Sequence, residues 1–429
     1  MSMIIAIGLF AVTYVLMLTF QKYRPYFALG CGVIFVLSGL LPAHEIFSSI
    51  DLNVLLMIAG TMGLVALFID SKMPALLADL VMERVPNVQW AAVALSLFAG
   101  IISAFVDNVA TVLMVAPIAL EICKKLKTNP VPFIIAIAVS SNLQGAATLV
   151  GDTTAIMLGG EMGLSFMDFF VYEGKPGMFF AVELGAVISA LILYFLFRKE
   201  KGKIEKSAER TKVTDFVPSY LLIVMLVLLI AVSFIDLPQG FIKDNVNGLL
   251  CCALLVIGLV YTFIKNKTAS SVIEPLKTID LETLGILLGL FLMIGGLKSQ
   301  GVIDMIGQAL ASIGSNNTFL LYTVIVWFSV LISAFIDNIP YVATMLPIIA
   351  SISATAGIDP TALYFGLLSG ATLGGNLTPV GASANITGIG ILRKAGYEVK
   401  NSDFFKLGIP FTLAAIIPAY IFVWLVFGI

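Results

Sequence analysis

The chain has 429 residues, of which 59% are hydrophobic and only 12% are charged, and its net charge is −2. A soluble chain carries about 25% charged residues, and a soluble fold of this size has too little interior to bury so much apolar side chain. The composition therefore excludes a soluble protein, and the lack of excess positive charge argues against nucleic-acid binding.

Apolar stretches of about 20 residues, the length that crosses a bilayer, recur along the whole chain. Full-length candidates lie at about 3–20, 25–41, 52–70, 178–198, 217–235, 245–264, 279–297 and 408–428. The first has no Lys or Arg before it, unlike a secretory signal peptide, so we expect a retained span. These stretches predict an all-α, multi-pass protein embedded in the lipid bilayer.

Four further stretches are apolar but interrupted by polar residues. Those at about 130–160 and 360–392 are broken by Gly, Asn, Thr and Asp, and we predict broken helices that each cross once. Those at about 89–123 and 317–354 have a polar centre, which fits either two crossings or one re-entrant hairpin. The distribution of positive charge decides between these two interpretations.

If both polar centres are hairpin tips, all but three of the 24 Lys and Arg residues fall on one side of the membrane, the exceptions being Lys175, Lys243 and Lys298. Because positive residues concentrate in cytoplasmic loops, we assign this side to the cytoplasm. The predicted topology has ten spans and two re-entrant hairpins in the plasma (inner) membrane, with both termini outside. A short, highly charged linker at 199–216 lies in the cytoplasm.

The two halves that flank this linker resemble each other. ISAFVDNVATVLMVAP at 102–117 and ISAFIDNIPYVATMLP at 332–347 share eight of 16 residues at an offset of 230, with Asp-Asn in the same place in both. At the same offset, Leu143, Thr148 and Gly151 match Leu373, Thr378 and Gly381. A fixed offset across separate motifs indicates duplication, with repeats at 1–198 and 217–429. Each half has five crossings, an odd number, so we expect inverted repeats, an architecture typical of secondary transporters.

The interruptions carry the residue types that a transport site needs. Backbone that leaves helical geometry inside hydrocarbon is tolerated only where protein or a water-filled cavity covers it. Freed carbonyls can coordinate Na⁺, half-helix N-termini attract anions, and Gly allows a ligand to approach closely. The candidate substrate- and ion-binding residues are Asp107, Asn108, Thr111, Asn142, Gly145, Thr148, Gly151, Asp152, Asp337, Asn338, Gly375, Asn376, Thr378, Gly381, Ser383 and Asn385. Among them, the candidate ligands of Na⁺ are Asp107, Asn108, Asp337 and Asn338.

The Asp-Asn pairs also have a simpler interpretation, as N-caps of the helix that follows each turn, and capping can coexist with ion binding. Asp152 has Ala382 at the equivalent position, so a role for it rests on one repeat. No Lys or Arg lies within the interruptions, which argues against an arginine clamp for a multivalent anion and favours a cation or proton as one transported species. An Asp near the membrane centre costs roughly 2.5–3.5 kcal/mol, which favours a functional role.

Signatures of catalysis are absent, since the chain has no HExxH, GxSxG or Walker A motif. The single histidine, His44, and the four cysteines form no metal-ligand pattern. We therefore expect no enzyme activity and no cofactor beyond a coupling Na⁺ or H⁺. A membrane-embedded enzyme or a scaffold is the alternative from another class. A channel is a further alternative, and it would carry flux without accumulation against a gradient.

The interruptions resemble those of the ion transporter superfamily, which includes arsenite permeases, NhaD-type sodium/proton antiporters, the melanosomal P protein and divalent anion/sodium symporters. AATLVGD at 146–152 is similar to the ATLIGD stretch of the arsenite-permease and P-protein branch, and GGNLTPVGASAN at 374–385 is close to its second-repeat motif. Thr153-Thr154-Ala155 stands where that branch has Pro-Pro-Asn, and Asp-Asn replaces the Ser-Asn-Thr tips of the symporters.

This resemblance implies two sodium or proton sites, one per repeat, with the substrate between the tips. It also implies an elevator-like movement and a homodimer, with an ATPase partner if arsenite is the substrate. We therefore predict an ion-coupled secondary transporter that moves arsenite, another small oxyanion or a carboxylate by alternating access. A Na⁺/H⁺ antiporter, in which the cation is itself the substrate, is the alternative.

Overall fold

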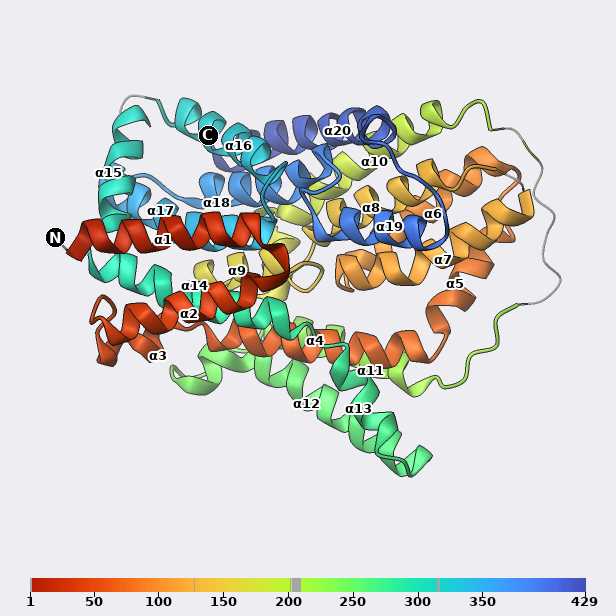
Figure 1. The fold of residues 1–429 in the computed structure, drawn as a ribbon, viewed down its shortest axis with the longest axis horizontal. Helices are drawn as coiled ribbons and strands as arrows, with labels where there is room; N and C mark the ends of the chain where they lie inside the picture. Colours follow the sequence, from red (N-terminus) through yellow and green to blue (C-terminus); the bar gives the residue numbers. More distant parts are fainter. Residues whose placement is uncertain (1, 127, 201, 203–209, 315–316) are drawn as a thin grey trace.

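The computed structural model describes residues 2–126, 128–200, 202, 210–314 and 317–429 (Figure 1). Residues 201 and 203–209 of the predicted linker lie outside the described part. The described residues form twenty α-helices and one small hairpin of the two-residue strands β1 (Val171–Tyr172) and β2 (Lys175–Pro176). The helices are α1 (Ser2–Thr19), α2 (Arg24–Leu37), α3 (Ile46–Ser49), α4 (Leu52–Asp70), α5 (Met73–Met82), α6 (Val88–Ser103), α7 (Asn108–Leu126), α8 (Val131–Gly145), α9 (Thr153–Met162), α10 (Met178–Leu196), α11 (Val217–Val232), α12 (Phe241–Asn266), α13 (Ser270–Lys277), α14 (Leu281–Ser299), α15 (Val302–Gly314), α16 (Thr318–Ser333), α17 (Asn338–Ala356), α18 (Thr361–Leu368), α19 (Ser383–Lys394) and α20 (Asn401–Phe427).

Seven of the described helices are long and apolar enough to cross a membrane, namely α1, α4, α10, α12, α14, α17 and α20. They confirm the prediction of an all-α, multi-pass membrane protein. The spans predicted at 25–41 and 217–235 contain the shorter helices α2 and α11. Because α17, which we predict as one arm of a hairpin, also has the length of a crossing, the count of ten spans stays a prediction.

The helices pack in pairs that combine the two halves of the chain. α4 lies against α12, α2 lies against α14, and α10 packs on α20. Figure 1 shows α5, α6 and α7 on the right of the molecule and α15, α16 and α17 on the left. Elements at matching places in the two predicted repeats thus lie at opposite ends. The repeat boundaries and the orientation of each half in a membrane stay predictions.

Both predicted tips are tight turns between two helices. α6 ends at Ser103 and α7 begins at Asn108, while α16 ends at Ser333 and α17 begins at Asn338, so the two turns keep the offset of 230. In each turn the Asp of the Asp-Asn pair immediately precedes a helix. This is the N-cap position, where a carboxylate can accept hydrogen bonds from unpaired backbone N–H groups.

The two predicted breaks also interrupt helices. α8 ends at Gly145 and α9 begins at Thr153. In the other half, α18 is followed by a π-helical turn at Ser369–Leu373 and a 3₁₀ turn at Gly375–Leu377 before α19 begins. Every residue from 133 to 159 is buried, so protein covers the irregular backbone of the first break. This coverage is the condition under which non-helical backbone is stable at membrane depth.

Each tip is fastened to the break of its own half by the same contacts. A threonine hydroxyl in the break donates to a backbone carbonyl of the tip, the pairs being Thr148 with Ala104 and Thr378 with Ala334. A Cβ atom added at Gly151 or Gly381 would lie 2.6–2.8 Å from three carbonyl oxygens. A larger residue would therefore have to displace backbone, which explains why both positions are glycine.

Candidate transport site

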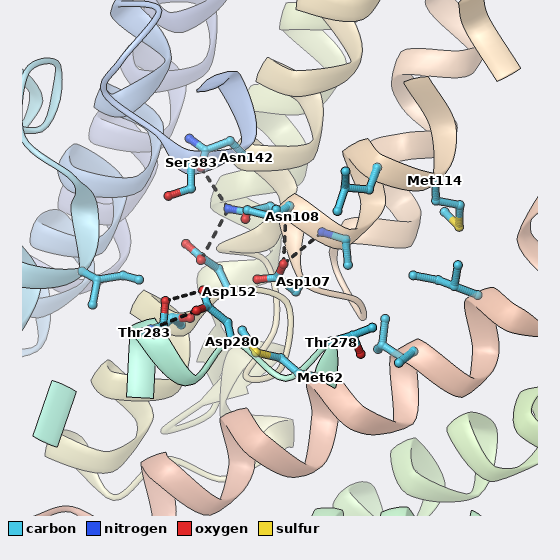
Figure 2. Close-up of a pocket in the computed structure, with 18 of the residues that line it drawn as sticks. Met62, Asp107, Asn108, Met114, Asn142, Asp152, Thr278, Asp280, Thr283 and Ser383 are labelled. Carbon is cyan, nitrogen blue, oxygen red and sulfur yellow. Dashed lines mark hydrogen bonds between the residues drawn. The ribbon is translucent and has the colours of Figure 1, made fainter. Parts of the chain in front are cut away.

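A cavity of about 300 Å³ lies where the two tips and the two breaks converge (Figure 2). α4 and the start of α14 complete its wall. Its polar lining residues are Asp70, Asp107, Asn108, Asn142, Asp152, Thr153, Thr278, Asp280, Thr283, Asp337, Asn338 and Ser383. Five of these are aspartates, and no Lys, Arg or His is among the described residues that line the cavity. The wall is therefore rich in groups that accept a cation or a proton.

Asp107 occupies the first tip as the N-cap of α7. Its Oδ1 accepts hydrogen bonds from the backbone N–H groups of Val109 and Ala110, each at 3.0 Å. Figure 2 shows its carboxylate facing the same space as Asp152 and Asp280. In the described part of the chain it forms no ion pair with a basic side chain. The predicted capping role is confirmed, and because the side chain still lines the cavity, capping leaves room for ion binding.

Asn108 connects this tip with the first break. Its Nδ2 donates to Oδ1 of Asn142 at 3.1 Å and lies 3.5 Å from Oδ1 of Asp152. The other oxygen of Asp152 accepts a hydrogen bond from Thr154 at 2.7 Å. Among the described residues, no cluster of three or more His, Cys, Asp or Glu is arranged to hold a metal ion. A cation bound beside Asp107 and Asp152 would therefore also need amide or carbonyl oxygens, which hard cations accept as ligands.

Asp337 occupies the second tip, where the surroundings differ. It caps α17 through Ile339 N–H at 3.5 Å, and its Oδ2 accepts a hydrogen bond from Ser383 at 3.2 Å. The same oxygen forms an ion pair with Nη1 of Arg24 at 3.3 Å, and the two side chains are only 16% (Arg24) and 18% (Asp337) exposed. No Lys or Arg lies within the interruptions in sequence, but the fold brings a basic side chain to the second tip from outside them. Arg24 comes from the start of α2, 313 positions away in the chain.

The neighbouring Asn338 fastens the second tip to its surroundings. With its nitrogen turned toward them, the amide donates to the carbonyls of Gly381 and Ala371, each at 3.2 Å. The side chain is 5% exposed and also lines the cavity. Asn338 thus contributes to the rigidity of the tip as well as to the wall of the cavity.

The two breaks contact each other directly. Nδ2 of Asn142 donates to the carbonyl of Thr372 at 2.7 Å and to Oδ1 of Asn376 at 3.1 Å. In return, Nδ2 of Asn376 donates to the carbonyl of Val139 at 2.9 Å. The hydroxyls of Thr154 and Thr372 are 2.9 Å apart. These bonds between buried groups hold the breaks of both halves in one arrangement.

α9 and α19 begin at the cavity without a capping side chain. Asp152 and Ala382 hold their N-cap positions, and neither side chain makes a capping hydrogen bond, although Asp152 does accept one from the hydroxyl of Thr154. The first helical residues, Thr153 and Ser383, line the cavity. Because unpaired N–H groups and the helix dipole attract negative charge, two partly positive helix ends face a cavity that otherwise carries carboxylates.

Fewer than half of the residues predicted for the site line this cavity. Those that do are Asp107, Asn108, Asn142, Asp152, Asp337, Asn338 and Ser383. Those that do not are Thr111, Gly145, Thr148, Gly151, Gly375, Asn376, Thr378, Gly381 and Asn385, all of them buried. Asn385 illustrates this second group, since its Nδ2 donates to the carbonyls of Gly375 and Thr378 at 3.2 Å. The residues of this second group pack behind the cavity wall.

The sequence reasoning missed Arg24 and the acidic wall formed by Asp70 and Asp280. Asp280 is the N-cap of α14 and accepts hydrogen bonds from the N–H and hydroxyl of Thr283 at 3.0 and 2.7 Å. An Asp at the start of an apolar span predicts a cap and says nothing about a cavity. Asp51, 229 residues earlier, caps α4 in the same way. A comparison of the residues that begin equivalent spans in the two repeats could have singled out Asp51 and Asp280.

A second cavity, of about 640 Å³, is formed by residues related to the first by an offset of 229. The α4 residues of the first cavity and their α14 counterparts in the second are Met62 and Phe291, Val65 and Ile294, Ala66 and Gly295, Ile69 and Lys298, and Asp70 and Ser299. None of the predicted site residues lines the second cavity. Both halves therefore form a cavity from matching elements, but only the first cavity reaches the tips.

Solved structures with this fold include two transporters. The YdaH transporter of Alcanivorax borkumensis has a TM-score of 0.62, with 92% of this chain and 89% of that chain covered at 14% identity. MtrF of Neisseria gonorrhoeae, described as one of a class of antimetabolite efflux pumps, has a TM-score of 0.61, with 92% and 84% covered at 17% identity. At these identities the likeness is one of fold alone.

Several relatives are similar in sequence. An uncharacterised transporter of Mycobacterium tuberculosis is 31% identical over 99% of this chain and 100% of its own length. A 46 kDa membrane protein of Mycobacterium leprae is 31% identical over 98% of both chains. The P protein of Mus musculus is 28% identical over 85% of this chain and 52% of its own length, which confirms the resemblance to the superfamily that contains it. The family model of citrate transporters (CitMHS) matches residues 14–368 and 249–429, and the chain therefore belongs to this family of membrane transporters.

Proposed function

We propose that this protein is a secondary transporter that moves a small carboxylate or inorganic oxyanion together with Na⁺ or H⁺. One observation carries the proposal: the uncapped starts of α9 and α19, at Thr153 and Ser383, line the same cavity as Asp107 and Asp152. The cavity thus combines groups that attract an anion with groups that attract a cation. A site that must hold both is a physical basis for coupling one to the other.

The carboxylates form the part of the proposed site that binds the cation. Asp107 and Asp152 have no basic partner in the described part of the chain, and Asp152 is 6% exposed. A buried carboxylate without a partner is costly unless it takes a proton or a cation. The amide of Asn108 lies beside Asp152 and is hydrogen-bonded to the amide of Asn142.

The starts of α9 and α19 form the part of the proposed site that binds the anion. No basic side chain lines the cavity among the described residues, so the donors available to an anion there are backbone N–H groups, hydroxyls and asparagine amides. Beside five aspartates, an anion that entered alone would be repelled. It binds only when a cation or protons have neutralised part of the wall, which makes the two binding events interdependent.

The size of the cavity limits the substrate. About 300 Å³ is at the small end of ligand pockets, which span roughly 300–1,000 Å³. This volume suits a carboxylate of a few carbon atoms or an inorganic oxyanion. Since the family is described as citrate transporters, citrate is the first substrate to test, with arsenite as the second.

The two cavities support alternating access as the mode of transport. They are built from matching residues at an offset of 229, but only the first reaches the tips. In the proposed cycle, the tips and breaks move together in an elevator-like manner, so that the second cavity reaches the site when the first is closed. We also propose a homodimer in the plasma membrane, with the linker in the cytoplasm and both termini outside.

The test is uptake of radiolabelled citrate into proteoliposomes under an imposed Na⁺ gradient, an imposed H⁺ gradient, or neither. Accumulation that requires one of the gradients supports the proposal, and Asp107→Asn should abolish the gradient dependence. Uptake that only equilibrates citrate would identify a channel instead. If neither citrate nor arsenite is taken up under any gradient, the carboxylate and oxyanion proposal is wrong.

A Na⁺/H⁺ antiporter is the second candidate, favoured by the five aspartates and the absence of basic residues among those described in the cavity wall. Proteoliposomes with an internal pH dye would receive pulses of Na⁺ or Li⁺ without any other substrate. Sodium-driven pH movement that is lost in both Asp107→Asn and Asp337→Asn would identify an antiporter. The absence of a pH response would rule this candidate out.

A further inference from the structure

The two tips are alike in sequence but differ in charge. Asp337 is paired with Arg24 at 3.3 Å. Asp107, at the equivalent position, receives only backbone hydrogen bonds from Val109 and Ala110 and has no basic partner in the described part of the chain. The first half also has a second carboxylate, Asp152, where the other half has alanine. One tip therefore has carboxyl groups without a basic partner among the described residues, whereas the carboxylate of the other tip is paired with a guanidinium.

Arg24 is held in place by more than this ion pair. Its Nε donates to the carbonyl of Met17 at 3.0 Å while Nη1 reaches Asp337. The Arg24 side chain is 16% exposed, and it does not line the cavity that Asp337 lines. It thus approaches the carboxylate from behind. Because a guanidinium does not lose its proton in a protein, its charge is permanent.

We propose that Arg24 takes the place of a coupling cation at the second tip, so that the protein binds a single Na⁺, at Asp107 and Asp152, instead of one per repeat. This inference rests on the proposed function only in treating the tip carboxylates as cation ligands. It names the residue that makes the two repeats functionally unequal.

The physical reason is competition for one carboxylate. A Na⁺ at Asp337 would either lie next to the guanidinium and be repelled by it, or displace it. Displacement would leave a largely buried positive charge without its partner, which is strongly unfavourable. Asp107 and Asp152 line the same cavity and pair with no basic side chain among the described residues, so Na⁺ has no resident positive charge to displace there.

Scintillation proximity binding of ²²Na⁺ to the purified full-length protein tests the proposal, because it counts ions per chain without a transported substrate. The native chain should bind one Na⁺. Arg24→Gln should bind two, since Asp337 becomes available, and the Hill coefficient should rise from about one toward two. Adding Asp337→Asn to Arg24→Gln should return the count to one. In the native background, Asp107→Asn should bind none.

Two variants separate charge from folding. Arg24→Lys keeps the positive charge and should still bind one Na⁺, and Lys22→Gln removes an exposed charge two residues away and should also bind one. A native count of zero or two, or an unchanged count in a folded Arg24→Gln protein, overturns the proposal. Citrate transport driven by protons with no Na⁺ bound would overturn this inference and leave the proposed function intact. One bound Na⁺ without any citrate or oxyanion transport would support this inference and overturn the proposed function.

Discussion

Asn142 and Asn376, which belong to the breaks of different halves, are hydrogen-bonded to each other at 3.1 Å. Each also donates to a backbone carbonyl of the opposite half, Asn142 to Thr372 at 2.7 Å and Asn376 to Val139 at 2.9 Å. The carbonyl of Thr372 belongs to the π-helical turn at Ser369–Leu373, where the regular α-helical pattern is lost. The two amides therefore join the breaks of the two halves by hydrogen bonds between buried groups.

Asn142→Ala should weaken this junction. The change removes two donated hydrogen bonds and leaves buried acceptors unpaired, which costs about 1–3 kcal/mol per unsatisfied group. We expect a thermal midpoint several degrees lower in detergent, measured by dye-based unfolding, and loss of transport. Ser96→Ala is the matched control, because the Ser96 hydroxyl bonds only to Ala92 in its own helix. Equal midpoints for the two variants would contradict the role given to Asn142.

Gly151→Ala and Gly381→Ala should each separate a tip from its break. The added methyl group would lie 2.6–2.8 Å from three carbonyl oxygens, and overpacking of this kind costs about 1–3 kcal/mol. We expect lower thermal midpoints and transport rates for both. Gly390→Ala in α19 is the control, since nothing lies within 4 Å of its added Cβ and Ala favours a helix. Midpoints for the Gly151 and Gly381 variants at or above that of the control would show that the tip is not fixed as described.

Asp337→Asn and Asp107→Asn should affect stability in opposite ways. Asn is a good N-cap, so capping survives in both variants. Asp337→Asn leaves Arg24 without its partner and should lower the thermal midpoint. Asp107→Asn removes a carboxylate without a basic partner among the described residues and should leave the midpoint unchanged or higher.

A double variant completes this comparison. Arg24→Gln combined with Asp337→Asn should be less destabilised than the sum of the two single variants, because the pair is removed as a unit. Additive shifts in the thermal midpoint would mean that the two side chains do not interact in the folded protein.

Thr153→Pro tests the part of the site that binds the anion, and it leaves in place the side chains that bind the cation. Proline is tolerated at the first position of a helix, and Asp152 before it is already extended, with φ −146° and ψ 148°. The substitution removes one N–H group and the Thr153 hydroxyl at the cavity, and the loss of even one hydrogen bond should raise KM for citrate about tenfold. The thermal midpoint should change little.

Leu52→Pro provides the control for this change, at the first position of α4. It should leave KM for citrate unaffected. A KM for Thr153→Pro that equals the native value would mean that the start of α9 does not contact the substrate.

The sequence predicted the parts of this structure that depend on local pattern and on internal comparison. Hydropathy located six of the seven described helices that are long and apolar enough to cross a membrane, and the offset of 230 located Asp107 and Asp337 at equivalent turns. It did not predict that Arg24 pairs with Asp337, because this contact joins residues 313 positions apart and depends on how α2 packs. Asp280 was missed for a related reason: its local signal is that of an N-cap, and its place in the cavity wall depends on where α14 lies beside the first tip.

The contacts at Gly151 and Gly381 have a mechanical consequence. Each tip is locked to its own break at a distance that excludes even a methyl group, and Asn142 joins one break to the other. The contacts at Gly151, at Gly381 and between Asn142 and Asn376 leave no hinge between the tips and the breaks. In the proposed alternating-access cycle, the displacement that connects the site with the second cavity would therefore carry both tips and both breaks as one rigid body, which slides against α4 and α14.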